Sequence, residues 1–250
     1  MIKFFRKIRQ RLLDEGKLAK YLAYAIGEIL LVVIGILIAL QINNWNEARK
    51  STRQEALYLK RLLSESRENL ITFEKNLGDL ERDVESIETL SDALTGSDVA
   101  DATLITAAND YFGYGSIYPI FTSSKSTFDD LASTGNLKDI SNSDLRNQLV
   151  KHYALHDQVA ERIRIGNEWA LPVDAPFTYQ NSIMRLEPVS NFLFGDQSSV
   201  ELANHLREKK TAYMNNAAVH FWINKDAIDQ LHTLIDETSK MISSMETELQ

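Results

Sequence analysis

The 250-residue sequence contains no cysteine, and this absence excludes several classes of protein at once. Disulfide scaffolds, thiol-dependent enzymes and lipoproteins anchored through a cysteine all require that residue. A cysteine-free chain is compatible with an oxidising compartment but does not require one.

Common enzyme signatures are also missing. The sequence has no glycine-rich phosphate-binding loop and no Gly-x-Ser-x-Gly nucleophile elbow. His152 and His156 stand four residues apart, but Tyr153 occupies the position where a zinc-protease helix carries glutamate. We therefore expect no enzymatic activity, no cofactor and no metal site, and we expect both histidines at a helix surface or seam.

Charge is distributed unevenly along the chain. The formal net charge of −8 divides into +4 over residues 1–45 and −12 over the remainder. Nucleic-acid binding requires a basic surface that displaces phosphate counterions, which the acidic remainder does not offer. The sequence therefore predicts no nucleic-acid partner.

One long hydrophobic run is present, from Tyr21 to Leu40, and Glu28 is its only charged residue. Twenty helical residues extend roughly 30 Å, the thickness of the hydrocarbon core of a bilayer. The run predicts a transmembrane helix over residues 21–42, with membrane lipid as a partner. Tyr24 and Trp45 lie near its two ends, where aromatic residues favour the interface.

The flanking charges predict the orientation of this span. Seven Lys and Arg residues precede it, whereas the first cations after it are Arg49, Lys50 and Arg53. The excess predicts a cytoplasmic N-terminus and a C-terminal domain on the outer side of the membrane. No small-x-small cleavage site follows Leu40, which favours an uncleaved signal anchor over a cleaved signal peptide.

Residues 1–20 form a basic segment on the cytoplasmic side. Ile2, Phe5, Ile8 and Leu12 recur at helical spacing among Lys and Arg. This pattern is typical of an amphipathic helix lying on an anionic leaflet. The alternative is a positive flank with no role of its own.

Small residues predict a helix–helix contact within the span. Ala23, Gly27, Gly35 and Ala39 fall on one four-residue spacing, and Glu28 adjoins them. A smooth face lets another helix approach closely, and a carboxylate in the apolar layer is costly unless it has a partner. We expect a homo-oligomer or another membrane-protein partner; snorkelling of Glu28 and a proton path remain as alternatives.

The outer domain, residues 43–250, carries two long apolar stripes at helical spacing. One forms a coiled-coil heptad seam from Ala56 to Leu94, and the other runs from Ser199 to Leu249. Each helix would have about fifty residues. The predicted fold class is all-α: one N-terminal transmembrane helix followed by an elongated antiparallel helical bundle with two long helices.

Shorter helices are expected between the long ones. They cover Ala102–Phe112, Ser124–Thr134 with a C-cap at Gly135, and Asp144–Ala170. Loops are expected near residues 95–101, 113–123 and 171–198, the last because of Pro172, Pro176 and Pro188.

Two of these loops are candidate recognition surfaces. Their aromatic residues are Tyr111, Tyr114, Tyr118 and Phe121 in one region, and Phe177 and Tyr179 in the other. Tyrosine-rich loops make adaptable contacts. For the first region, the favoured interpretation is that these rings close the open end of the helical core, and recognition is the alternative.

Two segments carry a resemblance to a known family. The first 47 residues, ending in Gln-Ile-Asn-Asn-Trp-Asn-Glu, and the segment Ser126–Leu137 resemble an uncharacterised domain-of-unknown-function family of Bacteroidota. The resemblance implies a single-pass inner-membrane protein with a periplasmic domain, and it implies no activity.

The leading hypothesis is a membrane-anchored periplasmic interaction or sensory module of unknown ligand that is not an enzyme. The alternative is an accessory subunit of an ion-driven or transport-coupling membrane complex that uses Glu28, by analogy of topology alone.

Overall fold

The computed structural model describes residues 18–250, and every regular element in that range is helical. The long helices are α2 (Leu18–Thr95), α5 (Ser143–Gln180) and α7 (Lys210–Glu248), and the shorter ones are α3 (Asp101–Asp110), α4 (Ser126–Thr134) and α6 (Ser199–Glu208). The predicted all-α bundle is therefore confirmed. Residues 1–17, most of the predicted basic segment, lie outside the described residues.

The chain divides into two compact units, residues 1–56 and 57–250, and the boundary falls inside α2. In the first unit, an apolar window with a mean hydropathy of 2.6 has none of its residues buried. A core helix of a soluble protein buries such a surface. The first unit thus carries one candidate membrane span, and all five residues predicted to face another helix are exposed there: Ala23, Gly27, Glu28, Gly35 and Ala39.

The second unit is a bundle in which the first and last long helices run antiparallel. Leu59 of α2 packs in one apolar cluster with Met245, near the end of α7. Leu90 of α2 packs in another cluster with Tyr213, near the beginning of α7. The beginning of α2 in this unit therefore lies beside the end of α7, and the end of α2 lies beside the beginning of α7. This arrangement confirms the antiparallel pairing expected from the sequence.

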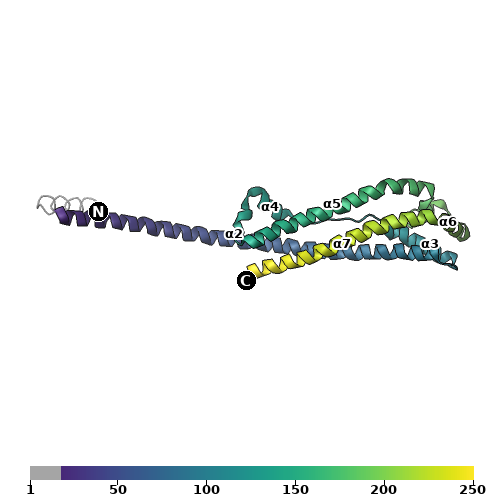
Figure 1. Cartoon of the computed structure of the whole chain (residues 1–250), viewed down its shortest axis with the longest axis horizontal. Coiled ribbons are helices and arrows are strands. Elements are labelled where there is room, and N and C mark those ends of the chain that lie inside the picture. Colours follow the sequence, from purple (N-terminus) through teal and green to yellow (C-terminus); the bar gives the residue numbers. More distant parts are fainter. Residues whose placement is uncertain (1–17) are drawn as a thin grey trace. The chain divides into compact units, whose positions relative to one another are not determined.

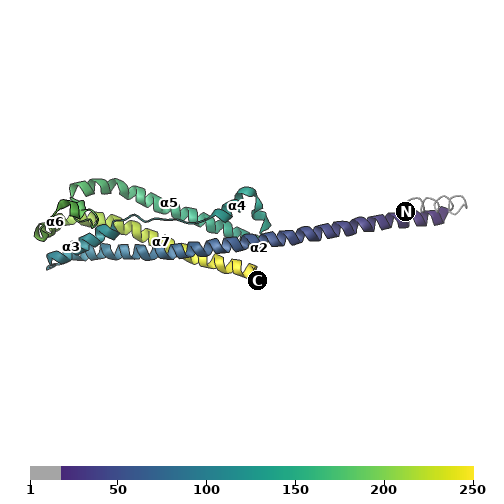
Figure 2. The same cartoon turned by 180° about the vertical axis from the view of Figure 1, so that it is seen from behind.

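Helix α5 is the third long member of the bundle and runs parallel to α2. Leu149, near its beginning, shares a cluster with Leu59, whereas Ile183, just past its end, shares a cluster with Leu90. The two views show α4 at one end of the bundle and α3 with α6 at the other (Figures 1 and 2).

A parallel pair of helices needs a connection that returns along the whole bundle. After α3, the π-helix η1 (Tyr111–Gly115) packs on α2, and residues 116–125 then lead back to α4 without regular structure. A Cβ atom at Gly115 would lie 2.8 Å from Cγ1 of Ile87, so only glycine permits this approach. Gly135 ends α4 at a φ of 74°, which confirms the predicted C-cap.

Two expectations about helix length are wrong. The C-terminal element is not one helix of about fifty residues, because Lys209 separates α6 from the 39-residue α7. The 171–198 loop begins only at Asn181, because α5 continues through Pro172 and Pro176. Each proline removes one helical N–H, but both prolines are exposed, so water can solvate the carbonyls that lose their partners.

The 113–123 loop also begins later than expected. Residues 113–115 belong to the π-helix η1 (Tyr111–Gly115) instead of the expected loop. Tyr111 and Phe112 are buried in the apolar cluster around Leu90, and this burial keeps the chain helical to Gly115. The irregular segment therefore starts at Ser116.

Candidate functional site

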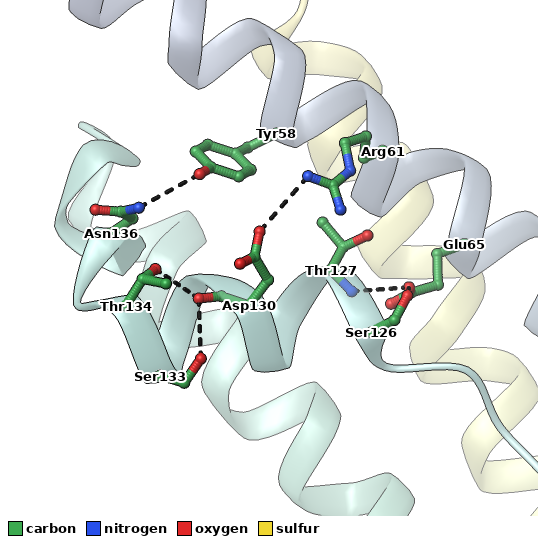
Figure 3. Close-up of polar contacts among 9 residues, drawn as sticks. All are labelled: Tyr58, Arg61, Glu65, Ser126, Thr127, Asp130, Ser133, Thr134 and Asn136. Carbon is green, nitrogen blue, oxygen red and sulfur yellow. Dashed lines mark hydrogen bonds and ion pairs between the residues drawn. The ribbon is translucent and has the colours of Figure 1, made fainter.

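Helix α4 and the residues before it dock on the part of α2 that lies in the second unit (Figure 3). Asn69 makes two hydrogen bonds with the backbone of Ser124: its Nδ2 donates to the carbonyl, and its Oδ1 accepts from the N–H, both at 2.7 Å. One turn earlier, Glu65 accepts from the Ser126 hydroxyl at 2.8 Å and from the Thr127 N–H at 3.0 Å. A carboxylate of α2 thereby caps the N-terminus of α4.

Glu65 is buried, and its two oxygens accept from different elements. The second oxygen accepts from the Tyr153 hydroxyl of α5 at 3.0 Å. Burial by itself raises the pKa of a carboxyl group, but the hydrogen bonds from Thr127, Ser126 and Tyr153 outweigh it, so the pKa of Glu65 is lowered. Glu65 is therefore an ionised clamp that joins α2, α4 and α5.

Weaker contacts surround this clamp. Nη1 of Arg61 lies 3.6 Å from the Asp130 carboxylate, and Nδ2 of Asn136 lies 3.4 Å from the Tyr58 hydroxyl (Figure 3). The Arg61–Asp130 pair is exposed and contributes little by itself. Together these contacts align the segment Ser126–Leu137, which carries part of the resemblance noted above, along one face of α2.

A second polar cluster surrounds Asp174 in α5, at the end of the bundle that holds α3 and α6. Asp174 accepts hydrogen bonds from the Tyr118 hydroxyl, from Nδ2 of Asn216 at 2.7 Å and from Nε2 of His220 at 3.0 Å. Tyr111 donates to Oδ1 of Asn216 at 2.7 Å. The cluster ties the predicted loop regions around 113–123 and 171–198 to α7.

Electrostatics around Asp174 favour an ionised carboxylate. Burial raises its pKa, but the hydrogen bonds from His220, Tyr118 and Asn216 lower it, and the net direction is down. Burial, followed by the hydrogen bond to Asp174 and its charge, raises the pKa of Tyr118, which therefore stays a donor. The cluster is therefore a structural junction, in which Asp174 of α5 accepts hydrogen bonds from the segment after η1 and from α7.

The six aromatic residues predicted for recognition differ in exposure. Tyr111 is fully buried and Tyr114 and Tyr179 are exposed. Phe121 stacks on Phe73 with ring centroids 5.5 Å apart, and Phe177 packs edge-on against Tyr213. The remaining three residues are half-buried: Tyr118, Phe121 and Phe177.

The histidines at 152 and 156 are buried in the bundle, not exposed at its surface. Their Nε2 atoms lie 3.1 Å apart, and the ring of His156 packs edge-on against Phe73. Within residues 22–250, no group of three His, Cys, Asp or Glu side chains is arranged to hold a metal ion. The pair is therefore a core contact between two neutral rings.

Acidic pH is expected to destabilise the bundle through this pair. Burial lowers the pKa of both rings below the ordinary value of 6.5, and His152 lowers that of His156 further. The unfolded chain therefore binds more protons below pH 6.5, and stability falls as the pH decreases. His156→Gln should reduce the stability lost between about pH 6.5 and 4 by at least about 1 kcal/mol.

Urea unfolding of the full chain at several pH values measures this difference. Exposed His232 provides the matched control, because His232→Gln should leave the pH profile unchanged. A profile for His156→Gln that coincides with the parent would contradict the prediction.

An exposed apolar surface lies between α5 and α6. Its most exposed members are Val189, Phe192, Leu193 and Phe194, and Tyr179 near the end of α5 is also exposed. None of them contributes to the three apolar clusters of the bundle. We refer to residues 186–197 as the tip loop.

The sequence did not single out Glu65, Asp174, Val189 or Leu193, although the last three lie in the 171–198 region that it indicated as a candidate recognition surface. A signal for Glu65 was present: it stands four residues before Asn69, and both are polar residues beside the apolar seam of α2. Asp174 had no such signal, because it lies between two prolines in a segment expected to be a loop.

Comparison with protein-family models matches residues 28–162 to a family of unknown function, DUF6090. The match covers more than half of the sequence, and the chain belongs to this family. The matched range contains Glu65 and α4 and ends inside α5, so Asp174 and the tip loop lie beyond it. Neither the curated proteins nor the solved structures compared with the chain gave a match.

Proposed function

We propose that this chain is a single-pass inner-membrane protein of the Bacteroidota envelope. Residues 21–42 span the bilayer with the N-terminus in the cytoplasm, and the bundle is a non-enzymatic interaction module in the periplasm. Support for the anchor comes from the first unit, where the apolar side chains of α2 are exposed to the surroundings. Lipid is the solvent in which such a surface is stable.

The exposed tip loop is the observation that carries the interaction function. Soluble domains rarely leave several large apolar side chains exposed side by side, and such patches mark contact sites. Here Val189, Phe192 and Leu193 are exposed within five residues of sequence. The polar clusters at Glu65 and Asp174 have hydrogen-bonded carboxylates and hold helices together, so the tip loop is the better candidate for contact.

Single-cysteine labelling tests location and contact in one experiment, since the parent chain has no cysteine. A small charged maleimide that does not cross the inner membrane is applied to intact cells. Ser51→Cys and Asp229→Cys should react fully, and Gln10→Cys should react only after lysis. Leu193→Cys at the tip should be at least about tenfold slower in cells than in detergent extract, because a contact covers it.

Two outcomes would reject the proposal. Labelling of Gln10→Cys but not of Ser51→Cys would reverse the orientation. Equal reactivity of Leu193→Cys and of exposed Asp229→Cys in cells would show that the tip loop is uncovered.

A further inference from the structure

The tip loop presents apolar side chains on all sides of a short helix. Its centre is the 3-10 helix η4 (Asn191–Phe194), which has no buried residue. Phe192 and Leu193 are each 72% exposed, Phe194 is 49% exposed, and Val189 in the preceding turn is 80% exposed. A folded chain in water does not gain stability from this arrangement, so the surface needs another explanation.

The base of the loop is held by hydrogen bonds. Nε of Arg185 donates to the Gln197 side chain at 2.7 Å, and Nε2 of Gln197 donates to the Arg185 carbonyl at 3.0 Å. Glu187 accepts from the N–H groups of Val189 and Ser190 at 3.0 and 2.7 Å. The apolar apex is therefore presented by a braced loop, which lowers the entropy that a contact would cost.

The geometry of η4 indicates what kind of surface covers the apex. A 3-10 helix has three residues per turn, so Phe192, Leu193 and Phe194 point outward about 120° apart. A protein groove covers one face of a short helix, whereas a lipid phase surrounds every side of it. Helices that are apolar all round are found in cores or in membranes.

The absence of charged residues at the apex also favours a lipid phase over a protein groove. No charged residue occurs between Pro188 and Gly195, and Glu187 is occupied by the hydrogen bonds of the turn. Inserting the apex into a hydrocarbon layer would therefore bury no charged side chain. The backbone groups of the turn are partly paired, with Leu193 N donating to Ser190 O and Gly195 N to Phe192 O.

We propose that the apex Val189–Phe194 inserts into the apolar layer of a lipid bilayer. This proposal rests on the proposed function, because it names the partner of the surface assigned there. The bilayer that we propose is a second one facing the tip, because Leu186 of the tip loop packs with Leu90 of α2, whereas α2 enters the bundle at Leu57, at the opposite end.

Fluorescence of the full chain in lipid nanodiscs tests insertion directly. Leu193→Cys is labelled with the environment-sensitive dye NBD, and protein-free vesicles are added. Doxyl lipids are placed either in the nanodisc or in the vesicles, so that quenching identifies the bilayer that is entered. We expect a blue-shifted emission and quenching by the doxyl lipids of the vesicles, and neither change for the same dye on Asp229→Cys; quenching by the nanodisc lipids alone would overturn the choice of bilayer.

A variant separates apolar insertion from other causes. For this test the dye is moved to Val189→Cys. The substitutions Phe192→Ser, Leu193→Ser and Phe194→Ser are then made together, and this triple variant should reduce quenching at least about tenfold. Ile71→Ser, which replaces an exposed apolar residue of α2, is the matched control and should leave quenching unchanged. Coincident urea unfolding curves for both variants would show that the fold is kept.

Failure of this proposal and failure of the proposed function give different results. In one case the dye emission is neither shifted nor quenched, while Leu193→Cys is still protected from maleimide in cells. This result would overturn lipid insertion and leave a protein as the partner. In the other case the dye emission is unshifted and Leu193→Cys reacts fully with maleimide in cells. This result would overturn both lipid insertion and the proposed interaction function of the tip loop.

Discussion

Replacing Glu65 with alanine should lower the free energy of unfolding by about 3 kcal/mol and release α4 from α2. The substitution removes the acceptor of the Thr127 N–H, the Ser126 hydroxyl and the Tyr153 hydroxyl together. A buried donor without an acceptor costs about 1–3 kcal/mol, and water can reach only part of this site. Figure 3 shows two of the three donors, Ser126 and Thr127 at the start of α4, beside Glu65.

The measurement is chemical unfolding of the full chain in mild detergent, combined with hydrogen exchange of residues 124–134. Faster exchange in that segment is expected before global unfolding. Arg61→Ala is the control, because the exposed Arg61–Asp130 pair should contribute less than about 1 kcal/mol. Equal losses for Glu65→Ala and Arg61→Ala would falsify the assignment of Glu65 as the clamp.

Low pH should imitate this substitution. The pKa of Glu65 is lowered in the folded chain, below the ordinary value of 4.5. Its stabilisation is therefore fully present above pH 4.5 and is lost as the pH falls through the lowered pKa. The destabilisation caused by Glu65→Ala should accordingly shrink in that acidic range.

Replacing Asp174 with alanine should cost a similar amount, about 3 kcal/mol, but at the opposite end of the bundle. Tyr118, Asn216 and His220 would lose their shared acceptor. Because Asp174 joins the segment after η1 to α5 and α7, hydrogen exchange should increase around residues 111–121 while α4 stays protected.

Asp174→Asn keeps the shape and one acceptor oxygen, so it should cost less than the alanine variant. Asp229→Ala, on the exposed surface of α7, should cost less than about 0.5 kcal/mol. Unchanged exchange at residues 111–121 in Asp174→Ala would argue against this junction.

The helix ends that the sequence predicted well are those fixed by local chemistry. A loop was expected near residues 95–101, and α2 ends at Thr95, directly before Gly96. Gly135 adopts the left-handed conformation that ends α4. Both signals act within one turn of the helix, so no knowledge of distant residues is needed.

The predictions that went wrong depended on distant partners. Pro172 and Pro176 indicated a loop by their local rules, but α5 continues between them, where Asp174 bonds to α7 and to Tyr118. Tyr111 was a candidate recognition residue, but the apolar cluster around Leu90 buries it completely, as expected for a ring that closes the core.

The sequence by itself determined the all-α class, the apolar segment, and the antiparallel pairing of the first and last long helices. Periodicity, charge and composition encode these features in neighbouring residues. Only the tertiary structure decided that α5 runs parallel to α2, that Glu65 caps a helix 61 residues later, and that the tip loop is uncovered. Burial and hydrogen bonding between distant residues depend on how helices pack, which local patterns do not specify.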